Sequence, residues 1–451
     1  VFKSLPFIAV LLMWLFIVFS ELYSTAVSGG EYGVSFYPFT NQLVELIVDP
    51  LTIFSLILII YYSAEIVWKE RNLKFNLIID ATPVKNSVFF LSKYTALFLL
   101  PMILIIIGIA MCLIFQISLG YTNFEFAIYG SVFYFYGLQL MVFCMIALFV
   151  NTLVKNKYMG MGIFGLIAVM SLKSDVLGLE HPLSSIGFMP RVSYSNMYGF
   201  YDGVTLYNHL ALYWTALGLI LIAISFKIWN RGVVTSFSNK MIQLLKNWTR
   251  AQKLTLSTLI VIFIGLGSFV YYNLNIKSDY RTSDDRLTYS ENYERKFKKY
   301  DSLIRPTRIS IKTEVDIFPK ERAYSVKATQ ILKNSSDQPL SEIFITERVP
   351  LEQVSIENAK STNYDGTYGI HLFQFDNPLQ PNDSVMFTYE LKKETKGYND
   401  DLSTIKNGTY INRFSNFEPS LGYNSGLEIS NGFEREKRNL PKRRKVSRYC
   451  S

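Results

Sequence analysis

The stretch YYSAEIVWKERNLKFNLIIDATPVKNSVFFLSKY, residues 61–94, places a charged segment between two long apolar runs. Within it, bulky apolar side chains recur at helical spacing: Trp68, Phe75, Ile78 and Ile79. This spacing predicts an amphipathic helix that carries them on one face. Pro83 disfavours helical backbone at the residue before it, so we expect the helix to stop near Asp80. Such a helix lies along lipid headgroups or docks into a groove on a cytosolic partner.

The chain around this stretch divides into two parts of different composition. Of its 451 residues 50% are hydrophobic and 18% charged, but residues 1–274 hold the long apolar runs and residues 275–451 are polar. A membrane-spanning helix needs about 20 mostly apolar residues. By this criterion we expect seven spans: 5–22, 44–65, 94–118, 127–150, 157–173, 208–229 and 254–274. In the fifth run the cluster GMGIFG, residues 160–165, indicates close helix packing through small side chains.

The basic residues of the connecting loops predict an orientation. Loops 22–43 and 119–125 contain no Lys or Arg, whereas loop 66–93, the loop with Lys155 and Lys157, and the segment 227–253 are basic. Short cytoplasmic loops carry the excess of Lys and Arg. We therefore expect the N-terminus and the basic loops in the cytoplasm of a multi-pass plasma (inner) membrane protein. The last span, 254–274, then delivers residues 275–451 to the extracytoplasmic side.

The polar C-terminal part begins with a charged linker and continues with strand patterns. Residues 275–304 predict an exposed, partly helical stalk. Period-two runs then follow, with turn residues between them: RISIKTEVDIF, YSVKATQILKN, EIFITERV, VSIENA, GIHLFQF and SVMFTYELKK. The expected fold class is an α-helical polytopic membrane domain followed by an all-β sandwich or saddle.

The opening stretch also carries a sequence pattern, Glu-x-x-Trp-x-Glu-Arg, then Ile-Ile-Asp-Ala-x-Pro, then a lysine in the next helix. Its members are Glu65, Trp68, Glu70, Arg71, Ile78, Ile79, Asp80, Ala81, Pro83 and Lys93. The pattern resembles the first cytoplasmic loop of ABC-type exporter permeases of the type-2 superfamily, in particular bacterial permeases fused to an aminopeptidase-N-like domain. The resemblance implies a coupling helix that binds a separate ABC ATPase through Glu65, Trp68, Lys69, Glu70, Arg71, Lys74, Phe75 and Asp80.

The same resemblance implies a domain plan. Residues 1–230 would form a six-helix permease unit, with short re-entrant helices in 175–208. A basic cytoplasmic loop (231–253), a seventh helix (254–274), the charged stalk (275–304) and a β-domain (305–451) would follow. One six-helix unit forms half of a translocation path in this family. A second permease half or a homodimer is therefore implied.

The β-domain resembles the N-terminal domain of aminopeptidase-N-type zinc peptidases. After the strand runs come Asn407-Gly408-Thr409-Tyr410-Ile411, Pro419-Ser420-Leu421-Gly422-Tyr423 and Arg435, in the family's order. The zinc-binding His-Glu-x-x-His does not occur in this sequence, whose three histidines are His181, His209 and His371. We therefore expect a β-domain truncated before the catalytic domain, with zinc and peptidase activity only in a longer parent.

Other classes of chemistry find little support in the sequence. It contains no G-x-x-x-x-G-K-[ST] to cradle phosphates, so ATP would bind to a partner subunit. We expect no enzyme activity and no cofactor in this chain. The basic tail REKRNLPKRRKVSRYCS suits nucleic acid by composition, but on the outer side of a membrane we expect no nucleic-acid partner.

Two functions of different classes remain open at this point. The first is a transmembrane permease subunit of an ABC-type exporter, driven by an ATPase that docks on the first cytoplasmic loop. The second is a membrane-anchored, peptidase-like or peptide-binding module that is catalytically inactive as given. The pattern in residues 65–83 favours the first, because an anchor has no need of an ATPase-docking segment.

Overall fold

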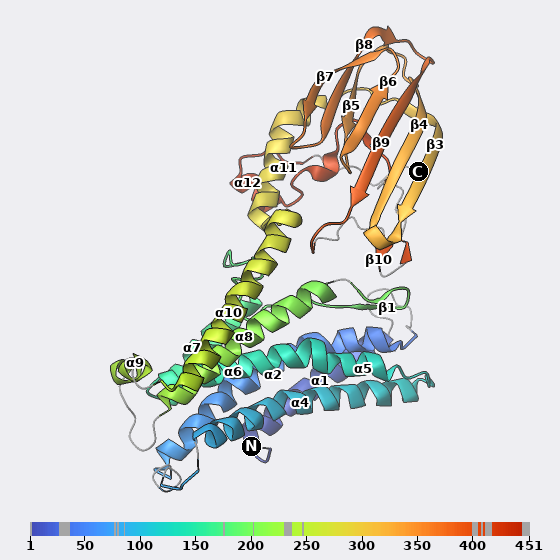
Figure 1. The fold of residues 1–451 in the computed structure, drawn as a ribbon. Coiled ribbons are helices and arrows are strands. Elements are labelled where there is room, and N and C mark those ends of the chain that lie inside the picture. Colours follow the sequence, from blue (N-terminus) through green and yellow to red (C-terminus); the bar gives the residue numbers. More distant parts are fainter. Residues whose placement is uncertain are drawn as a thin grey trace. The chain divides into compact units, whose positions relative to one another are not determined.

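The computed structural model describes residues 2–26, 37–75, 78, 81–84, 86–174, 176–201, 203–229, 237–245, 248–398, 405–406, 409–410 and 417–443. The chain forms two compact units, residues 1–273 and 274–451 (Figure 1). The N-terminal unit is helical, and the C-terminal unit consists mainly of strands.

Helices make up the N-terminal unit. They are α1 (Leu5–Ala26), α2 (Thr40–Asn72), α4 (Asn86–Ser118), α5 (Phe126–Val132), the π-helix η2 (Phe133–Gly137), α6 (Leu138–Leu153), α7 (Lys157–Leu172), α8 (Val204–Ile228), α9 (Phe237–Leu245) and α10 (Arg250–Tyr271). The π-helix η3 (Tyr272–Lys277) continues α10 into the second unit. Within the described residues, six helical segments are long and apolar enough to cross a membrane, with α5–η2–α6 and α10–η3 each acting as one. This confirms the coarse prediction of a multi-helix membrane unit.

The fifth predicted span, residues 157–173, is not supported. It forms α7, whose 16 residues fall short of the roughly 20 that a span needs. Asn156 ends the preceding turn and caps α7 by accepting a hydrogen bond from the backbone N–H of Met159 at 2.9 Å. Of the small residues in this helix, Gly160 faces Asn151 of α6, while Gly162 and Gly165 face open space. The predicted close packing therefore holds at one glycine only.

The π-helix η2 interrupts the span from Phe126 to Leu153 and has a local cause. A π-turn leaves carbonyl groups without their usual α-helical partner. The hydroxyl of Tyr207, a fully buried residue of α8, donates to the carbonyls of Tyr134 and Phe135 at 2.7 and 3.1 Å. The bulge is thus joined to α8 by a side chain from outside the helix.

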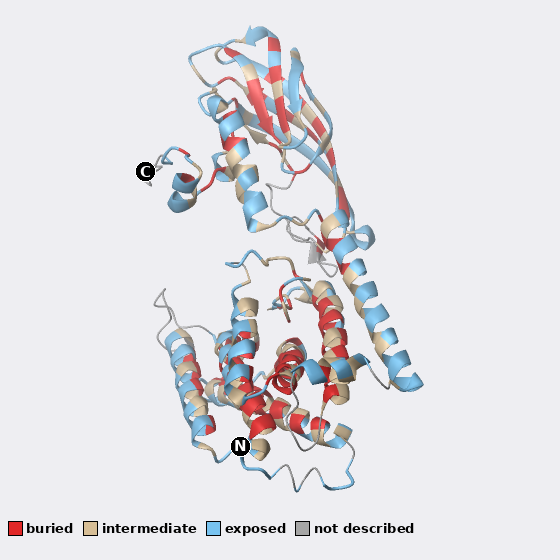
Figure 2. Cartoon of the chain, turned by 90° about the vertical axis from the view of Figure 1, so that its left-hand side faces the viewer, coloured by how far each residue is buried: buried red, intermediate tan, exposed pale blue. Residues whose placement is uncertain are grey.

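Helix α2 lies at the centre of the N-terminal unit and contacts α1, α4, α6 and α7. More than half of its most apolar window is buried, whereas only 6% of the corresponding window of α10 is (Figure 2). Helix α10 packs on α8, where the rings of Phe263 and Tyr213 stack at 4.4 Å between centroids. The apolar remainder of α10 is open on this unit's surface, as lipid contact requires.

The segment between α7 and α8 differs from the re-entrant helices that the resemblance implied. Its described residues, 176–201, form turns and a two-residue hairpin of β1 (Tyr194–Ser195) with β2 (Gly199–Phe200). Glycines at positive φ, Gly178, Gly187 and Gly199, turn the chain in this segment. The described part therefore contains no helix.

Two four-stranded antiparallel sheets form the C-terminal unit. One has the order β3-β4-β9-β6 and the other β12-β5-β8-β7. The strands are β3 (Thr307–Phe318), β4 (Ala323–Lys333), β5 (Leu340–Thr346), β6 (Leu351–Ile356), β7 (Ala359–Asp365), β8 (Ile370–Leu379), β9 (Ser384–Glu394) and β12 (Ser420–Leu421), besides a small pair of β10 (Ile405–Lys406) with β11 (Thr409–Tyr410). All six predicted strand runs are present, and β7 is additional.

The sheets share one apolar core. Residues of β4 and β9 alternate between buried and exposed, and the buried set, including Val326 and Phe387, packs against Ile345 of β5 and Phe373 of β8. This alternation is the pattern from which the strands were predicted. Burial of this core is the main source of stability that the strands provide.

The predicted exposed stalk is wrong in one respect, because part of it is packed into the C-terminal unit. Helix α11 (Ser283–Phe297) begins with a capping box between Thr282 and Asp285. Its residues Tyr293 and Phe297 are buried against Phe344, Ile370 and Tyr423. Aromatic residues four apart on one helical face supply this packing, and the charged residues between them hide it in the composition.

Candidate functional site

The predicted docking residues that the structure describes lie in the last two turns of α2 and in the turn that follows. Helix α2 continues to Asn72, and Lys74 then takes a positive φ of 58°, which ends it. Trp68 is buried at 3% exposure, whereas Phe75 lies in the turn and is 51% exposed. The predicted single face through Trp68 and Phe75 is therefore not formed. Ile79 and Asp80 lie outside the described residues.

Glu70 of α2, which is partly exposed, forms an ion pair with Lys93 of α4. The Lys93 ammonium, 8% exposed, lies 2.7 Å from a Glu70 carboxylate oxygen and donates to the backbone carbonyl of Ile66 at 2.9 Å. Because Lys93 has little access to water, loss of Glu70 would leave a poorly solvated charge. This pair joins the end of α2 to the start of α4.

Two further contacts join the end of α2 to other helices. Glu65 pairs with Lys157, the first residue of α7, at 3.4 Å. The Arg71 guanidinium lies between two indole rings, 5.4 Å from that of Trp68 and 5.3 Å from that of Trp229 at the end of α8. Cation–π contacts of this kind are stronger when the cation is partly desolvated. Three of the predicted docking residues, Glu65, Glu70 and Arg71, thus hold helices together.

Lys240 of α9 lies at the same end of the N-terminal unit and binds the C-terminus of α6. Its ammonium, 3% exposed, donates to the carbonyls of Thr152, Leu153 and Val154 at 2.6, 3.4 and 3.5 Å. Unpaired carbonyls at a helix C-terminus favour a cation. Burial, and then the positive charge of Arg71, lowers the pKa of the Lys240 ammonium to about 8. The short helix α9 is thereby attached to the end of α6.

We call these residues the basic end: Glu65, Trp68, Glu70, Arg71, Lys93, Lys157, Trp229 and Lys240. Beside it, Lys69, Lys74, Phe75 and Ile78 are exposed, and we call these four the exposed turn. Phe75 and Ile78 are large apolar side chains at 51% and 66% exposure, next to two lysines. An apolar pair with a cationic rim has the composition of a small docking surface.

A second buried polar cluster occurs in the C-terminal unit. Arg435, in the short helix α12 (Gly432–Lys437), binds Glu294 of α11 through two hydrogen bonds of 2.6 and 2.8 Å. Both side chains are at most 4% exposed. The guanidinium also donates to the carbonyls of Ile429 and Pro441. Each nitrogen of the guanidinium therefore donates to an oxygen, as a buried arginine requires.

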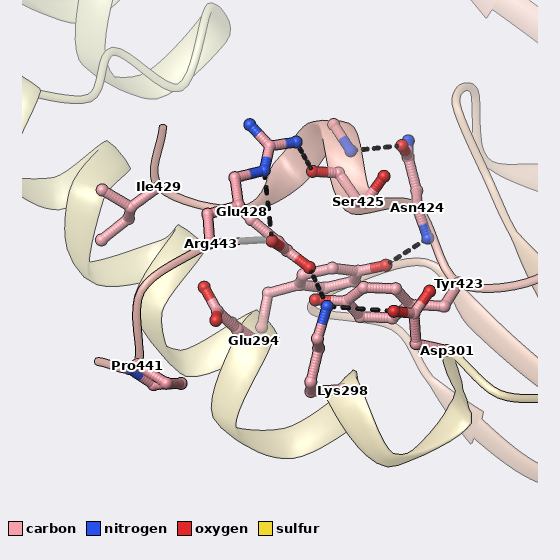
Figure 3. A network of polar contacts seen from close by, with 12 residues as sticks. Glu294, Lys298, Asp301, Tyr423, Asn424, Ser425, Glu428, Ile429, Pro441 and Arg443 are labelled. Atoms are coloured by element: carbon pink, nitrogen blue, oxygen red, sulfur yellow. Dashed lines mark hydrogen bonds and ion pairs between the residues drawn. The ribbon is translucent and has the colours of Figure 1, made fainter. Parts of the chain in front are cut away.

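Next to this pair, Glu428 is held between two cations (Figure 3). Its 2% exposed carboxylate lies 2.6 Å from Lys298 and 3.4 Å from Arg443. The Tyr423 ring stacks on Tyr293, and its buried hydroxyl faces these charges. Burial, with Glu428 nearby, raises the pKa of Tyr423. These contacts fix the C-terminal segment 417–443 to α11.

The structure places Tyr423 and Arg435 of the predicted motif in this cluster, and Thr409 and Tyr410 in β11. Ser420 and Leu421 form β12, Gly422 has a φ of +84° against the Arg305 side chain, and Arg435 and Tyr423 are buried. Asn407, Gly408 and Ile411 lie outside the described residues. The motif therefore builds a structural join between the strands, the segment that follows them and α11.

Sequence reasoning missed several members of both clusters. Lys157 and Lys240 were read only as loop charges, and Glu294 only as part of a charged linker. One signal was available, the aromatic spacing Tyr289, Tyr293 and Phe297 in α11. Among the described residues, no group of three or more His, Cys, Asp and Glu could hold a metal ion.

Comparisons of the chain with protein-family models, curated proteins and solved structures give no match.

Proposed function

We propose that the chain is a transmembrane permease subunit of an ABC-type exporter, driven by a separate ATPase that docks on the exposed turn. The observation that carries the proposal is the position of this turn. It directly follows α2, the central helix of the N-terminal unit, whose end is joined by side chains to α4, α7 and α8. A displacement of the exposed turn would therefore be transmitted through these contacts to α4, α7 and α8.

The distribution of charge supports the proposed orientation. Basic loops that are far apart in sequence meet at one end of the unit through the contacts of Lys93, Lys157 and Lys240. Cytoplasmic placement of Lys- and Arg-rich loops would put that end in the cytoplasm of the plasma membrane. ATP would bind to the partner, and a second permease half or a second copy would complete the path. Residues 274–451 would be extracytoplasmic.

The exposed turn allows a test that spares the internal contacts. Phe75→Glu combined with Lys69→Glu removes the apolar contact and reverses one charge at exposed positions. We expect ATPase co-purification to fall on the order of tenfold or more, because central apolar anchors dominate small interfaces. The matched control is Phe318→Glu, at an apolar residue of the C-terminal unit that is 40% exposed.

A clear result requires that both variants insert into the membrane like the wild type. ATPase bound equally by all three chains would sink the docking proposal. Loss of binding in both variants would point to misfolding, and Phe75→Ala would then separate the two causes, since alanine adds no charge.

The alternative, a membrane-anchored peptide-binding module, draws on one observation. The outer face of the sheet β3-β4-β9-β6 has a hollow of about 380 Å³, lined by polar side chains that include Lys327, Ser355, Thr388 and Glu390. Lys327 and Glu390 pair at 3.2 Å and Ser355 bonds Thr388 at 2.7 Å. The groups of this hollow thus satisfy each other. Peptide binding by a chain that recruits no ATPase would favour this alternative.

A further inference from the structure

The edge strand β3 has unusual features for a free sheet edge. It is 12 residues long, and among the described residues it pairs only with β4. Ile309 and Ile311 are 54% and 52% exposed. Long edges with apolar side chains invite pairing with another strand, and proteins usually shorten or cover them.

The sequence of β3 is complementary to itself in one antiparallel register. With Thr313 opposite its own copy, Lys312 lies opposite Glu314 of the second copy, and Glu314 opposite its Lys312. In the same register Ile311 meets Val315 and Ile309 meets Ile317. Opposite charges and apolar pairs at directly opposed positions are the stabilising combinations of antiparallel sheets.

The neighbouring registers bring like charges together. A register centred on Lys312 sets lysine against lysine, and one centred on Glu314 sets glutamate against glutamate. A slip of one strand by a single residue places its apolar side chains on the opposite face of the sheet from those of its partner. Of the registers centred on Lys312, Thr313 and Glu314, only the one centred on Thr313 has no opposed like charges.

The side chains in question are available for this pairing. Lys312 and Glu314 are 79% and 67% exposed, and they pair with each other along the strand at 3.1 Å. On pairing, each copy would lose its own Lys312–Glu314 contact, and the two copies would form two such contacts with each other. This exchange costs little, because exposed ion pairs are weak. Chains that share one membrane also meet at a high effective concentration, so a modest interface suffices.

We propose that β3 pairs antiparallel with β3 of a second copy of this chain, centred on Thr313, so that two four-stranded sheets become one of eight strands. The surface is isologous, as in most homodimers. The proposal uses no residue of the exposed turn, and it stands or falls separately from the ATPase.

A cysteine at the two-fold axis tests the pairing in the full chain, in membranes. Opposed residues in antiparallel strands have Cα atoms about 4.5–5.5 Å apart, so T313C should link to itself with a short thiol cross-linker. The control S384C, at an exposed residue of β9 and two strands further from the edge, should not link. Failure of T313C to link would overturn the proposal.

Charge reversal identifies the second copy as the occupant. In the T313C background, K312E sets glutamate against glutamate twice per dimer and should lower the linked fraction on the order of tenfold. The swap K312E/E314K restores both pairs and should restore linking. A different protein or peptide on this edge has fixed charges, so a swap that fails to rescue would contradict the proposal.

Discussion

Lys240 of the N-terminal unit and Arg435 of the C-terminal unit are each 3% exposed, yet they are held in different ways. Among the described residues, Lys240 donates to the backbone carbonyls at the end of α6. Arg435 meets a carboxylate, Glu294, that is equally buried and binds it through two bonds. If α9 moves away, water can replace the partners of Lys240 and of the carbonyls. Water cannot do this for Arg435 and Glu294 while both stay buried.

This difference suggests which unit can rearrange. Separating a buried ion pair leaves two charges in a medium of low dielectric, which costs several kcal/mol. Releasing a lysine from helix-end carbonyls returns both sides to water at lower cost. The basic end, with half-exposed Glu70 and replaceable contacts, therefore suits a moving part. The cluster around Glu294 suits a fixed one.

The largest expected effect comes from breaking the Glu294–Arg435 pair. Arg435→Met leaves the Glu294 carboxylate buried without a counter-charge and should destabilise the C-terminal unit by about 3–5 kcal/mol. Hydrogen exchange at α11 is the appropriate measurement. The five tryptophans, at positions 14, 68, 214, 229 and 248, all precede residue 274, so their fluorescence does not report on this unit.

The double variant E294M/R435M is the matched control for that prediction. Apolar replacement of both partners removes the unpaired charge and should recover much of the lost protection. Protection of α11 that is unchanged in the single variant would mean that the pair does not hold the segment 417–443 in place.

A smaller effect is expected at α9. Lys240→Met leaves three carbonyls at the end of α6 without their donor, at a cost of about 1–3 kcal/mol. Exchange over residues 237–245 should then accelerate on the order of tenfold, with Ser238→Ala, at an exposed position of α9, as control. If Lys240→Met destabilised α9 as much as Arg435→Met destabilises α11, the proposed difference in rigidity between the two units would be wrong.

The smallest effect concerns pH. Lys296, by hydrogen bonding to Asp365, holds the pKa of that carboxyl below its usual range. A lowered folded-state pKa gives stability that is present above the unfolded value, about 4, and is lost as pH falls through the folded one. Pulse proteolysis in urea should show this loss below pH 4, and Asp365→Asn should show a flatter profile. Identical profiles would exclude the contribution.

The sequence predicts the helices and strands well where one physical signal dominates. Apolar length located the six long helices, and period-two alternation located β4 and β9. Strand β7 has mostly exposed, polar residues, so its pairing with β8 decides its conformation. The bounds of α7 agree with the predicted run 157–173 to within one residue, but a run of this length is too short for a span, which composition alone did not show.

The candidate sites were less predictable, since they depend on tertiary contacts. Trp68 is buried because α2 continues as one helix to Asn72, which places that side chain beside Arg71. Local spacing could not reveal the partner of Lys240, which is 88 residues distant in sequence from Thr152. Glu294 and Arg435 are likewise 141 residues apart.

Cross-linking from the exposed turn in living cells tests the central claim most directly. A photo-reactive amino acid at Phe75, with a matched position at exposed Phe126, the first residue of α5, would be followed by mass spectrometry of the linked proteins. The account predicts a cytosolic ATPase with a phosphate-binding loop, captured from position 75 and not from 126. Capture of lipid alone from position 75, or of the same proteins from both positions, would contradict it.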